Sequence, residues 1–223
     1  MRIYAVSCSP ERADRLRSAA APLGLDIVIV ESPKASDPEV VTRGATCFEK
    51  KTSYPTGLAA TIGHIRAMKQ LYDDGAPWGI IIEDDVRFHK RFNETVAKLE
   101  SSVTDADIVS LGFVNFPTGS LDVLNGVTLI KNVELSNPWG AQCYMITREY
   151  AKHLVDTFSG PDLYEPYKGN FVTDWVLFDP ILGCRRHTLV LPIAVEDPGE
   201  PTIAGSNNKP DLFAVLNRSL YHF

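Results

Sequence analysis

The sequence predicts an α/β protein, with a mostly parallel central sheet flanked by helices in a single domain. Strand-like and helix-like segments alternate through its first half, which is the signature of parallel βαβ units. Its 223 residues fit one domain better than two. Hydrophobic residues make up 44% of the chain, enough for a packed core.

Each element of the first half follows from a local pattern. Short apolar or β-branched runs predict strands at 3–6, 26–30, 78–82 and 107–111. Apolar residues spaced three and four apart predict helices at 10–23, 58–74 and 90–101. The polar, proline-containing segment 31–57 is predicted to be a loop.

The second half is less regular. Loops and a hairpin around Asn125-Gly126 are expected in residues 112–138. Further strands are predicted at 141–146 and 188–195, and helices at 147–158 and 173–178, with a loop at 159–170 and a polar tail at 196–211. The tail is expected to be a mobile surface loop. The alternative is that it acts as a lid that closes over a bound ligand. No linker or repeat divides the chain, so residues 1–223 are expected to form one domain.

Composition excludes several classes of partner and location. The chain has 22 Lys and Arg against 28 Asp and Glu, a formal charge of -6, so nucleic acid is not an expected partner. The longest apolar-rich segment, Leu189 to Val195, is far shorter than the ~20 residues that cross a bilayer. No signal peptide is recognisable and the four cysteines are scattered. We therefore expect a cytoplasmic protein with reduced thiols and no transmembrane segment.

Three adjacent carboxylates, Glu83-Asp84-Asp85, are the strongest indication of chemistry. They follow directly after the most apolar strand of the chain, and ligands of open α/β sheets lie at the carboxyl ends of strands. Because adjacent carboxylates repel one another, a cation is expected to offset them. Oxygen ligands on a short loop suit Mg²⁺ or Mn²⁺. The alternative is a solvated acidic turn.

Three other positions carry weaker signals. His64 lies on a helix edge and is either a structural residue or a catalyst. Asp174 begins a short helix, either complementing the helix dipole or serving as a general base whose pKa burial beside Trp175 would raise. The basic run Arg185-Arg186-His187 is either a solvated patch or a counter-charge for a diphosphate. Within it, His187 is a candidate additional metal ligand.

Several familiar mechanisms leave no motif in the chain. It contains neither the glycine-rich loops that hold nucleotide phosphates or dinucleotides, nor a Gly-x-Ser-x-Gly elbow, nor His-Glu-x-x-His. These absences favour an enzyme that uses a metal and carboxylates.

In their order, the motifs resemble glycosyltransferase family 25, which includes lipopolysaccharide and procollagen galactosyltransferases and relatives in large DNA viruses. The resemblance rests on short segments along nearly the whole chain: Ile3–Ser7 with Arg12 and Arg15-Leu16, Thr61–Ile65, Ile81–Val86, Trp139–Arg148 with Ala151–Leu154, Thr173–Trp175 and Pro201–Ile203. Within them, Glu83-Asp84-Asp85-Val86 is similar to the family's version of the DxD motif. Gly63 stands where the family has Ser, and Ser7 where it has Asn.

The resemblance implies a GT-A-type, Rossmann-like domain, with a nucleotide-sugar-binding half at 1–111 and an acceptor-binding half at 112–223. It also implies a metal-dependent inverting transfer from a nucleotide sugar, usually UDP-linked, to a glycan or glycoconjugate hydroxyl. A viral chain would then act in the host-cell cytoplasm. The implied roles are metal binding by Asp85 and Asp84, donor binding by Ser7, Arg12, His64, Glu83 and Asp84, and general base catalysis by Asp174. His187 stays a candidate metal ligand from the basic run alone.

Three other classes of function stay open at the level of sequence. One is a metal-dependent phosphoryl transferase, although the chain lacks a glycine-rich loop that would hold phosphates. A non-catalytic module could bind nucleotide sugars or glycans with the same residues. A glycoside hydrolase would instead pair two carboxylates ~5–10 Å apart across a glycosidic bond and would need neither nucleotide nor metal.

Overall fold

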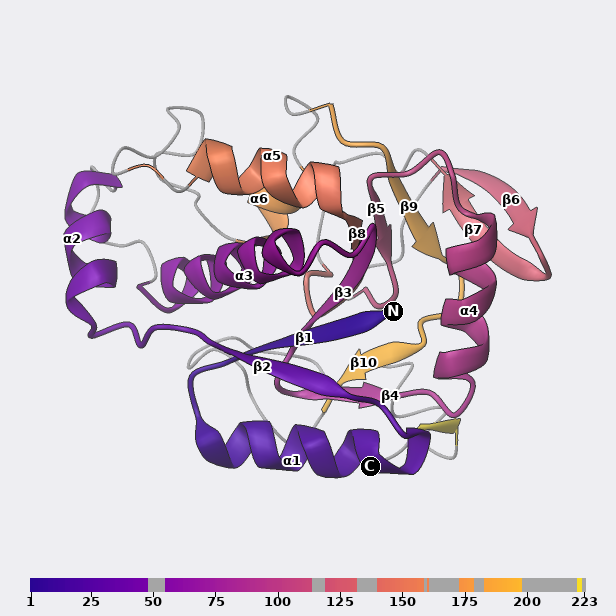
Figure 1. Cartoon of the computed structure of the whole chain (residues 1–223), viewed down its shortest axis with the longest axis horizontal. Helices are drawn as coiled ribbons and strands as arrows, with labels where there is room; N and C mark the ends of the chain where they lie inside the picture. The colour runs from indigo at the N-terminus through magenta and orange to yellow at the C-terminus, as the bar shows by residue number, and fades with distance from the viewer. Residues whose placement is uncertain are drawn as a thin grey trace.

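The computed structural model describes residues 1–47, 55–113, 119–131, 140–158, 160, 173–178, 183–197 and 220–221. An eight-stranded sheet forms its centre, with helices on both faces (Figure 1). From edge to edge, its strands are β2 (Ile27–Glu31), β1 (Arg2–Ser7), β3 (Trp78–Glu83), β8 (Cys143–Thr147), β5 (Ile108–Ser110), β9 (Arg186–Leu189), β7 (Val127–Lys131) and β6 (Ser120–Leu124). The predicted α/β class is confirmed.

The sheet is mixed, although most of its strands point one way. β1 pairs in parallel with β2 and β3, and β5 pairs in parallel with β9. β8 runs antiparallel between β3 and β5, and β7 runs antiparallel between β9 and β6. The carboxyl ends of β1, β3 and β5 therefore meet at the same edge of the sheet.

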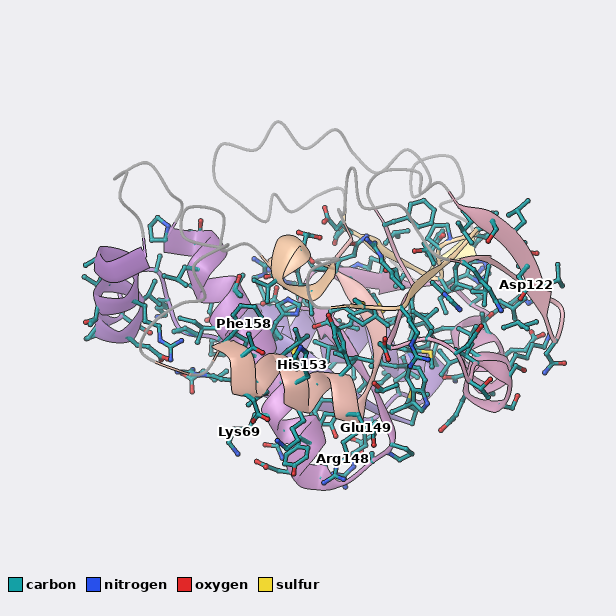
Figure 2. The ribbon with its side chains drawn as sticks, turned by 90° about the horizontal axis from the view of Figure 1, so that it is seen from above. Lys69, Asp122, Arg148, Glu149, His153 and Phe158 are labelled. Atoms are coloured by element: carbon teal, nitrogen blue, oxygen red, sulfur yellow. The ribbon has the colours of Figure 1, made fainter. Side chains whose placement is uncertain are left out.

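Two helical layers cover the sheet. One face carries α3 (Pro55–Asp74), α5 (Arg148–Phe158) and α6 (Thr173–Phe178). The other carries α1 (Pro10–Ala20), extended by a 3₁₀ turn at Ala21–Leu23, and α4 (Phe92–Ser102) (Figure 1). Figure 2 looks onto α5, which Arg148, Glu149, His153 and Phe158 mark along its length. These helices agree with the sequence predictions to within a few residues.

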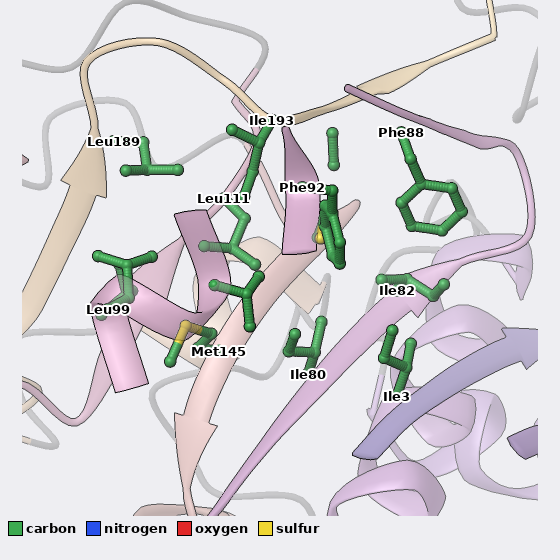
Figure 3. Close-up of a cluster of buried hydrophobic side chains, with 14 of the residues drawn as sticks. Ile3, Ile80, Ile82, Phe88, Phe92, Leu99, Leu111, Met145, Leu189 and Ile193 are labelled. Atoms are coloured by element: carbon green, nitrogen blue, oxygen red, sulfur yellow. The ribbon is translucent and has the colours of Figure 1, made fainter. Parts of the chain in front are cut away.

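Each face of the sheet has its own hydrophobic core, because side chains alternate along a strand. Tyr4 and Ile81 point into the core beneath α3 and α5. Ile80 and Ile82 point to the opposite side, where they join the cluster shown in Figure 3. Full burial of one such side chain contributes ~1.5–3 kcal/mol. This double burial explains why the strand reads as a continuous apolar run in the sequence.

A helix that the sequence did not indicate occupies part of the expected loop at 31–57. α2 spans Pro38–Cys47, and Val40 is buried in the core beside α3. The prediction of a loop was wrong here, because proline is tolerated in the first turn of a helix and marks its start rather than a break.

The strand expected at 188–195 is also divided. β9 ends at Leu189, and β10 (Ala194–Glu196) forms a separate two-stranded sheet with β4 (Val86–Phe88), a strand that was not predicted. Pro192 lies between the two pieces, and proline cannot donate a hydrogen bond to a strand ladder. β4 begins directly after the acidic triplet, so β10 lies beside the candidate site.

Other expectations are met or fall outside the described residues. The hairpin around Asn125-Gly126 is confirmed between β6 and β7, and both turn residues have positive φ, 50° and 75°, as a tight two-residue turn requires. The expectations for 161–172 and for the tail from 198 lie outside the described residues. Among the residues that are described, no helix is both long and apolar enough to cross a bilayer.

Candidate active site

The three carboxylates lie where the sequence predicted, at the carboxyl end of β3. Glu83 is the last residue of that strand and is paired in register with Val6 of β1. Asp84 and Asp85 form the turn into β4 and are 8% and 3% exposed. They are therefore buried carboxylates and not a solvated acidic turn, so the fold must compensate their charge.

Two residues from the first β–α unit reach the acidic triplet. The Ser7 hydroxyl, at the end of β1, donates a hydrogen bond of 2.6 Å to Asp84 Oδ2. Arg12 Nη2 lies 2.5 Å from Asp84 Oδ1 and 3.2 Å from Asp85 Oδ2. Ser9 caps α1 by accepting a hydrogen bond from the Arg12 backbone N–H at 3.4 Å, which fixes where the Arg12 side chain begins.

This compensation is incomplete. Asp85 Oδ1 is buried and has no hydrogen-bond partner among the described residues. Burial, followed by the charge of Glu83, raises the pKa of Asp85 to about 8 even though Arg12 opposes the shift. Burial and the charges of Asp174 and Asp84 raise the pKa of Glu83 to about 7. One guanidinium thus faces an excess of negative charge.

A divalent cation fits this arrangement of oxygens. Mg²⁺ and Mn²⁺ are commonly held by one or two carboxylates, with water and substrate phosphate as the other ligands. No ready-made group of three or more His, Cys, Asp or Glu ligands occurs within the described part of the chain. Asp84 and Asp85 match the partial set, and the orphaned Asp85 oxygen is the atom that a cation would satisfy.

His64 lies next to Glu83 on the face covered by α3. Its Nδ1 is 2.9 Å from the Tyr144 hydroxyl and its Nε2 is 3.4 Å from Glu83 Oε1. Burial lowers the pKa of His64 to about 4, so the ring is neutral at pH 7. A Tyr144 hydroxyl that donates to Nδ1 leaves the proton on Nε2, which then donates toward Glu83. The 1% exposed ring orients Glu83.

Asp174 begins α6 and links that helix to the turn before β8. Its Oδ1 accepts hydrogen bonds from the backbone N–H groups of Gly140 at 2.7 Å and Ala141 at 2.9 Å. Burial raises its pKa, as the sequence predicted, although both backbone hydrogen bonds and the charges of His64 and Arg186 oppose the shift. The side chain of Trp175 lies outside the described residues.

The basic run lies at the start of β9, where Arg185 precedes the strand and Arg186 and His187 point to opposite faces of the sheet. Arg185 pairs with Asp107 through Nη2 and Oδ1 at 2.7 Å. Arg186 is 4% exposed and donates from Nε to Ser110 Oγ at 3.2 Å. Burial lowers the pKa of Arg186 to about 10, and the charge of Asp174 opposes that shift. Arg186 therefore belongs to the polar group around Asp174, which neither interpretation of the basic run anticipated.

His187 points to the opposite face of the sheet from Arg186, because neighbouring residues of a strand alternate. Its Nε2 lies 3.2 Å from Asp105 Oδ1, just before the start of β5, whereas the acidic triplet follows the end of β3. The structure does not bring His187 to Asp84 and Asp85, so the expectation that it adds a metal ligand is corrected.

Sequence reasoning also missed the role of Tyr144 and Arg186 in this group. Tyr144 appeared only as part of a family motif, and Arg186 only as one of three basic residues. An Arg or Tyr at an inward position of a buried strand is the signal that could have singled them out. Reading that signal requires the correct strand boundary, and β9 begins at residue 186, two residues earlier than expected.

The comparison with protein families matches part of the chain. Residues 56–163 match the model of glycosyltransferase family 25, described as an LPS biosynthesis protein. The matched segment contains His64, Glu83, Asp84, Asp85 and Tyr144. No curated protein gives a significant match to the sequence.

Comparison with solved structures finds similar proteins at low sequence identity. One is a glycosyltransferase involved in glycosylation of the major capsid of PBCV-1, with a TM-score of 0.51, 10% identity, and coverage of 90% of this chain and 94% of that one. Another is HddC from Yersinia pseudotuberculosis, with a TM-score of 0.40, 12% identity, and coverage of 88% and 93%.

The family match supports glycosyltransferase activity, and the likeness to the viral enzyme extends over nearly the whole fold. The family comparison thus supports the resemblance expected from the motifs: residues 56–163 match the model of glycosyltransferase family 25, and the fold is similar to that of a solved glycosyltransferase.

Proposed function

We propose that this glycosyltransferase is metal-dependent and inverting, and that it moves a sugar from a UDP-linked donor to a hydroxyl of a glycan or glycoconjugate. The observation that carries the proposal is the orphaned, buried Asp85 Oδ1 within an acidic triplet at the carboxyl edge of the sheet. Such an atom favours a bound cation.

The donor would bind at this edge, where ligands of open α/β sheets are held. Asp85 and Asp84 would hold Mg²⁺ or Mn²⁺, which when bound neutralises charge on a departing nucleoside diphosphate. Ser7 lies beside them through its hydrogen bond to Asp84. Glu83, oriented by His64, would bind the ribose or order the metal ligands.

The acceptor hydroxyl would lose its proton to Asp174. Oδ1 of this residue is already engaged by two backbone N–H groups, so Oδ2 is the atom that would take the proton. Its raised pKa suits a general base, which contributes ~10²–10⁴-fold to the rate. Attack on the face of the sugar opposite the leaving group inverts the anomeric carbon without a covalent intermediate.

The first test is turnover of a panel of UDP-sugars in the presence of Mn²⁺ or EDTA. We expect activity only with the metal, and its loss in Asp85→Asn. The matched control is Asp122→Asn, on the hairpin far along the sheet (Figure 2), which should behave as the wild type. Metal-independent turnover, or full activity in Asp85→Asn, would contradict the proposal.

The second test separates the enzyme from a binding module. Asp174→Asn keeps an oxygen that can accept both backbone hydrogen bonds, so donor binding and thermal stability should be retained while turnover falls ~10²–10⁴-fold. Asp174→Ala should also lower the melting temperature, because two buried N–H groups lose their acceptor. Full turnover in Asp174→Asn would exclude this residue as the base. A glycoside hydrolase would bind neither UDP nor Mn²⁺ in calorimetry.

A further inference from the structure

Arg12 occupies the position at which the proposed metal would act. Of the lysines and arginines that the structure describes, it is the one that forms ion pairs with the acidic triplet, through a single nitrogen, Nη2, shared between Asp84 and Asp85. Resting on the proposed function, we propose that Arg12 is an exchangeable counter-ion. It holds both carboxylates in the metal-free protein, competes with the divalent cation for them, and turns to the donor diphosphate once the metal has bound.

The contact between Arg12 and the two carboxylates lacks the geometry of a strong ion pair. A strong arginine–carboxylate pair uses two parallel N–H···O bonds, whereas here one nitrogen serves two carboxylates. Arg12 Nε is buried without a partner among the described residues, and so is Asp85 Oδ1. Two buried carboxylates therefore share one guanidinium that satisfies them only in part. A divalent cation compensates them better and releases the guanidinium.

Arg12 is also placed so that its side chain can leave. The side chain is 22% exposed, so it lies at the boundary between the buried carboxylates and solvent. Its backbone is fixed in the first turn of α1, where Ser9 caps the helix. The guanidinium can therefore move at the carboxyl edge of the sheet without disturbing α1, and a diphosphate is a bidentate partner that it binds well.

A nearby arginine pairs with a carboxylate outside the acidic triplet, and its Nε, like that of Arg12, is buried without a partner among the described residues. Arg87, in β4 immediately after the triplet, is paired with Asp197 beyond β10, and the Asp197 backbone N–H donates to the Asp85 carbonyl at 2.8 Å. Arg87 therefore pairs with a carboxylate to which no metal-binding role is assigned. Arg12 differs because its partners are the two carboxylates assigned to the metal.

The test is Mn²⁺ binding to the full chain by calorimetry without nucleotide, for wild type, Arg12→Gln and Arg17→Gln. Arg17 lies on the exposed side of α1 and pairs with Asp14, so its substitution makes the same charge change away from the site. We expect Arg12→Gln to bind Mn²⁺ about tenfold more tightly, because its competitor is gone, and to melt at a lower temperature without metal. Arg17→Gln should match the wild type.

A second measurement tests whether the Arg12 guanidinium binds the donor diphosphate once the metal is bound. In saturating Mn²⁺, UDP should bind Arg12→Gln about tenfold more weakly than wild type. Arg12→Lys keeps a charge without the planar fork, so its Mn²⁺ affinity should lie between the two, and it provides a folded variant if Arg12→Gln is unstable. Unchanged or weaker Mn²⁺ binding in both variants overturns the exchange but leaves the metal site intact. Absence of Mn²⁺ binding in the wild type overturns the metal-dependent function as well.

Discussion

At the scale of single residues, buried polar side chains from both faces of the sheet meet at its carboxyl edge and define the site. Glycine at position 63, just before His64, is required by packing. A Cβ there would lie 2.5 Å from Val6 Cγ1 and 2.6 Å from Ser32 Oγ. The Ser32 hydroxyl, which donates to the Ala59 carbonyl at 3.0 Å, fills the space that a serine at 63 would need. The departure from the family pattern therefore has a local steric reason.

The buried His64 should make folding stability depend on pH. Its folded-state pKa of about 4 lies below the ~6.5 of an unfolded histidine, so the unfolded state binds the proton first as the pH falls. The contribution of neutral His64 to stability should therefore be lost between about pH 6.5 and 4, and amounts to on the order of 3 kcal/mol at most. Because the raised pKa values of Glu83 and Asp85 act in the opposite sense over this range, the His64 contribution is measured by urea unfolding as the difference between wild type and a His64 variant.

His64→Gln should remove that contribution, so that its stability falls less than that of the wild type as the pH is lowered from 6.5 to 4. His153→Gln, on the exposed side of α5 (Figure 2), should leave that contribution unchanged. An equal slope of stability against pH in wild type and His64→Gln would show that other groups are responsible.

At the scale of elements, the small sheet of β4 and β10 supports the acidic turn. Asp85 lies immediately before β4, and the chain beyond β10 donates to its carbonyl through Asp197. β10 is held in place by close approach to Gly112, where a Cβ would lie 2.3 Å from the Ala194 carbonyl oxygen. A backbone atom cannot move aside as a flexible side chain would, so this glycine fixes how near β10 comes to the site.

Gly112→Ala should therefore displace β10. We expect a loss of ~1–3 kcal/mol in the free energy of unfolding and weaker Mn²⁺ binding, measured by chemical denaturation and calorimetry. Gly75→Ala is the control: its φ of +77° makes alanine strained but nothing lies within 4 Å of the added Cβ. It should lower stability without changing Mn²⁺ affinity. Unaltered Mn²⁺ affinity in Gly112→Ala would show that β10 does not support the site.

At the scale of the whole molecule, the site joins segments far apart in the sequence. β1 contributes Ser7, α1 contributes Arg12, and β3 with the turn after it contributes the acidic triplet. The segment after β10 adds a backbone hydrogen bond from Asp197 to the Asp85 carbonyl. A ligand that binds this group binds only the folded state. The overall charge of -6 does not prevent an anionic donor from binding, because the proposed metal would reverse the local charge.

Mn²⁺ with UDP should accordingly stabilise the entire fold. At a ligand concentration 100 times its dissociation constant, the gain is ~2.7 kcal/mol, visible as a rise in melting temperature over a sample in EDTA. Asp85→Asn should lose most of this rise, whereas Asp122→Asn should keep it. An equal rise in Asp85→Asn would place the ligand elsewhere.

The sequence by itself determined the features that depend on neighbouring residues. The α/β class, the main helices and the Asn125-Gly126 hairpin follow from periodicity and turn chemistry, and the acidic triplet was placed correctly because it directly follows an apolar strand. The same local reasoning failed at α2 and at β10. Pro38 begins a helix that was predicted to be a loop, and Pro192 interrupts a segment that was predicted to be one strand.

Only the tertiary structure decided which side chains face one another. β8 lies antiparallel between β3 and β5, and this order brings Tyr144 to His64, 80 residues away. Arg12 reaches Asp85 across 73 residues, and His187 is excluded because it points to the other face. Such contacts depend on strand order and register, which are set by packing over the whole core. No local pattern in the chain encodes them.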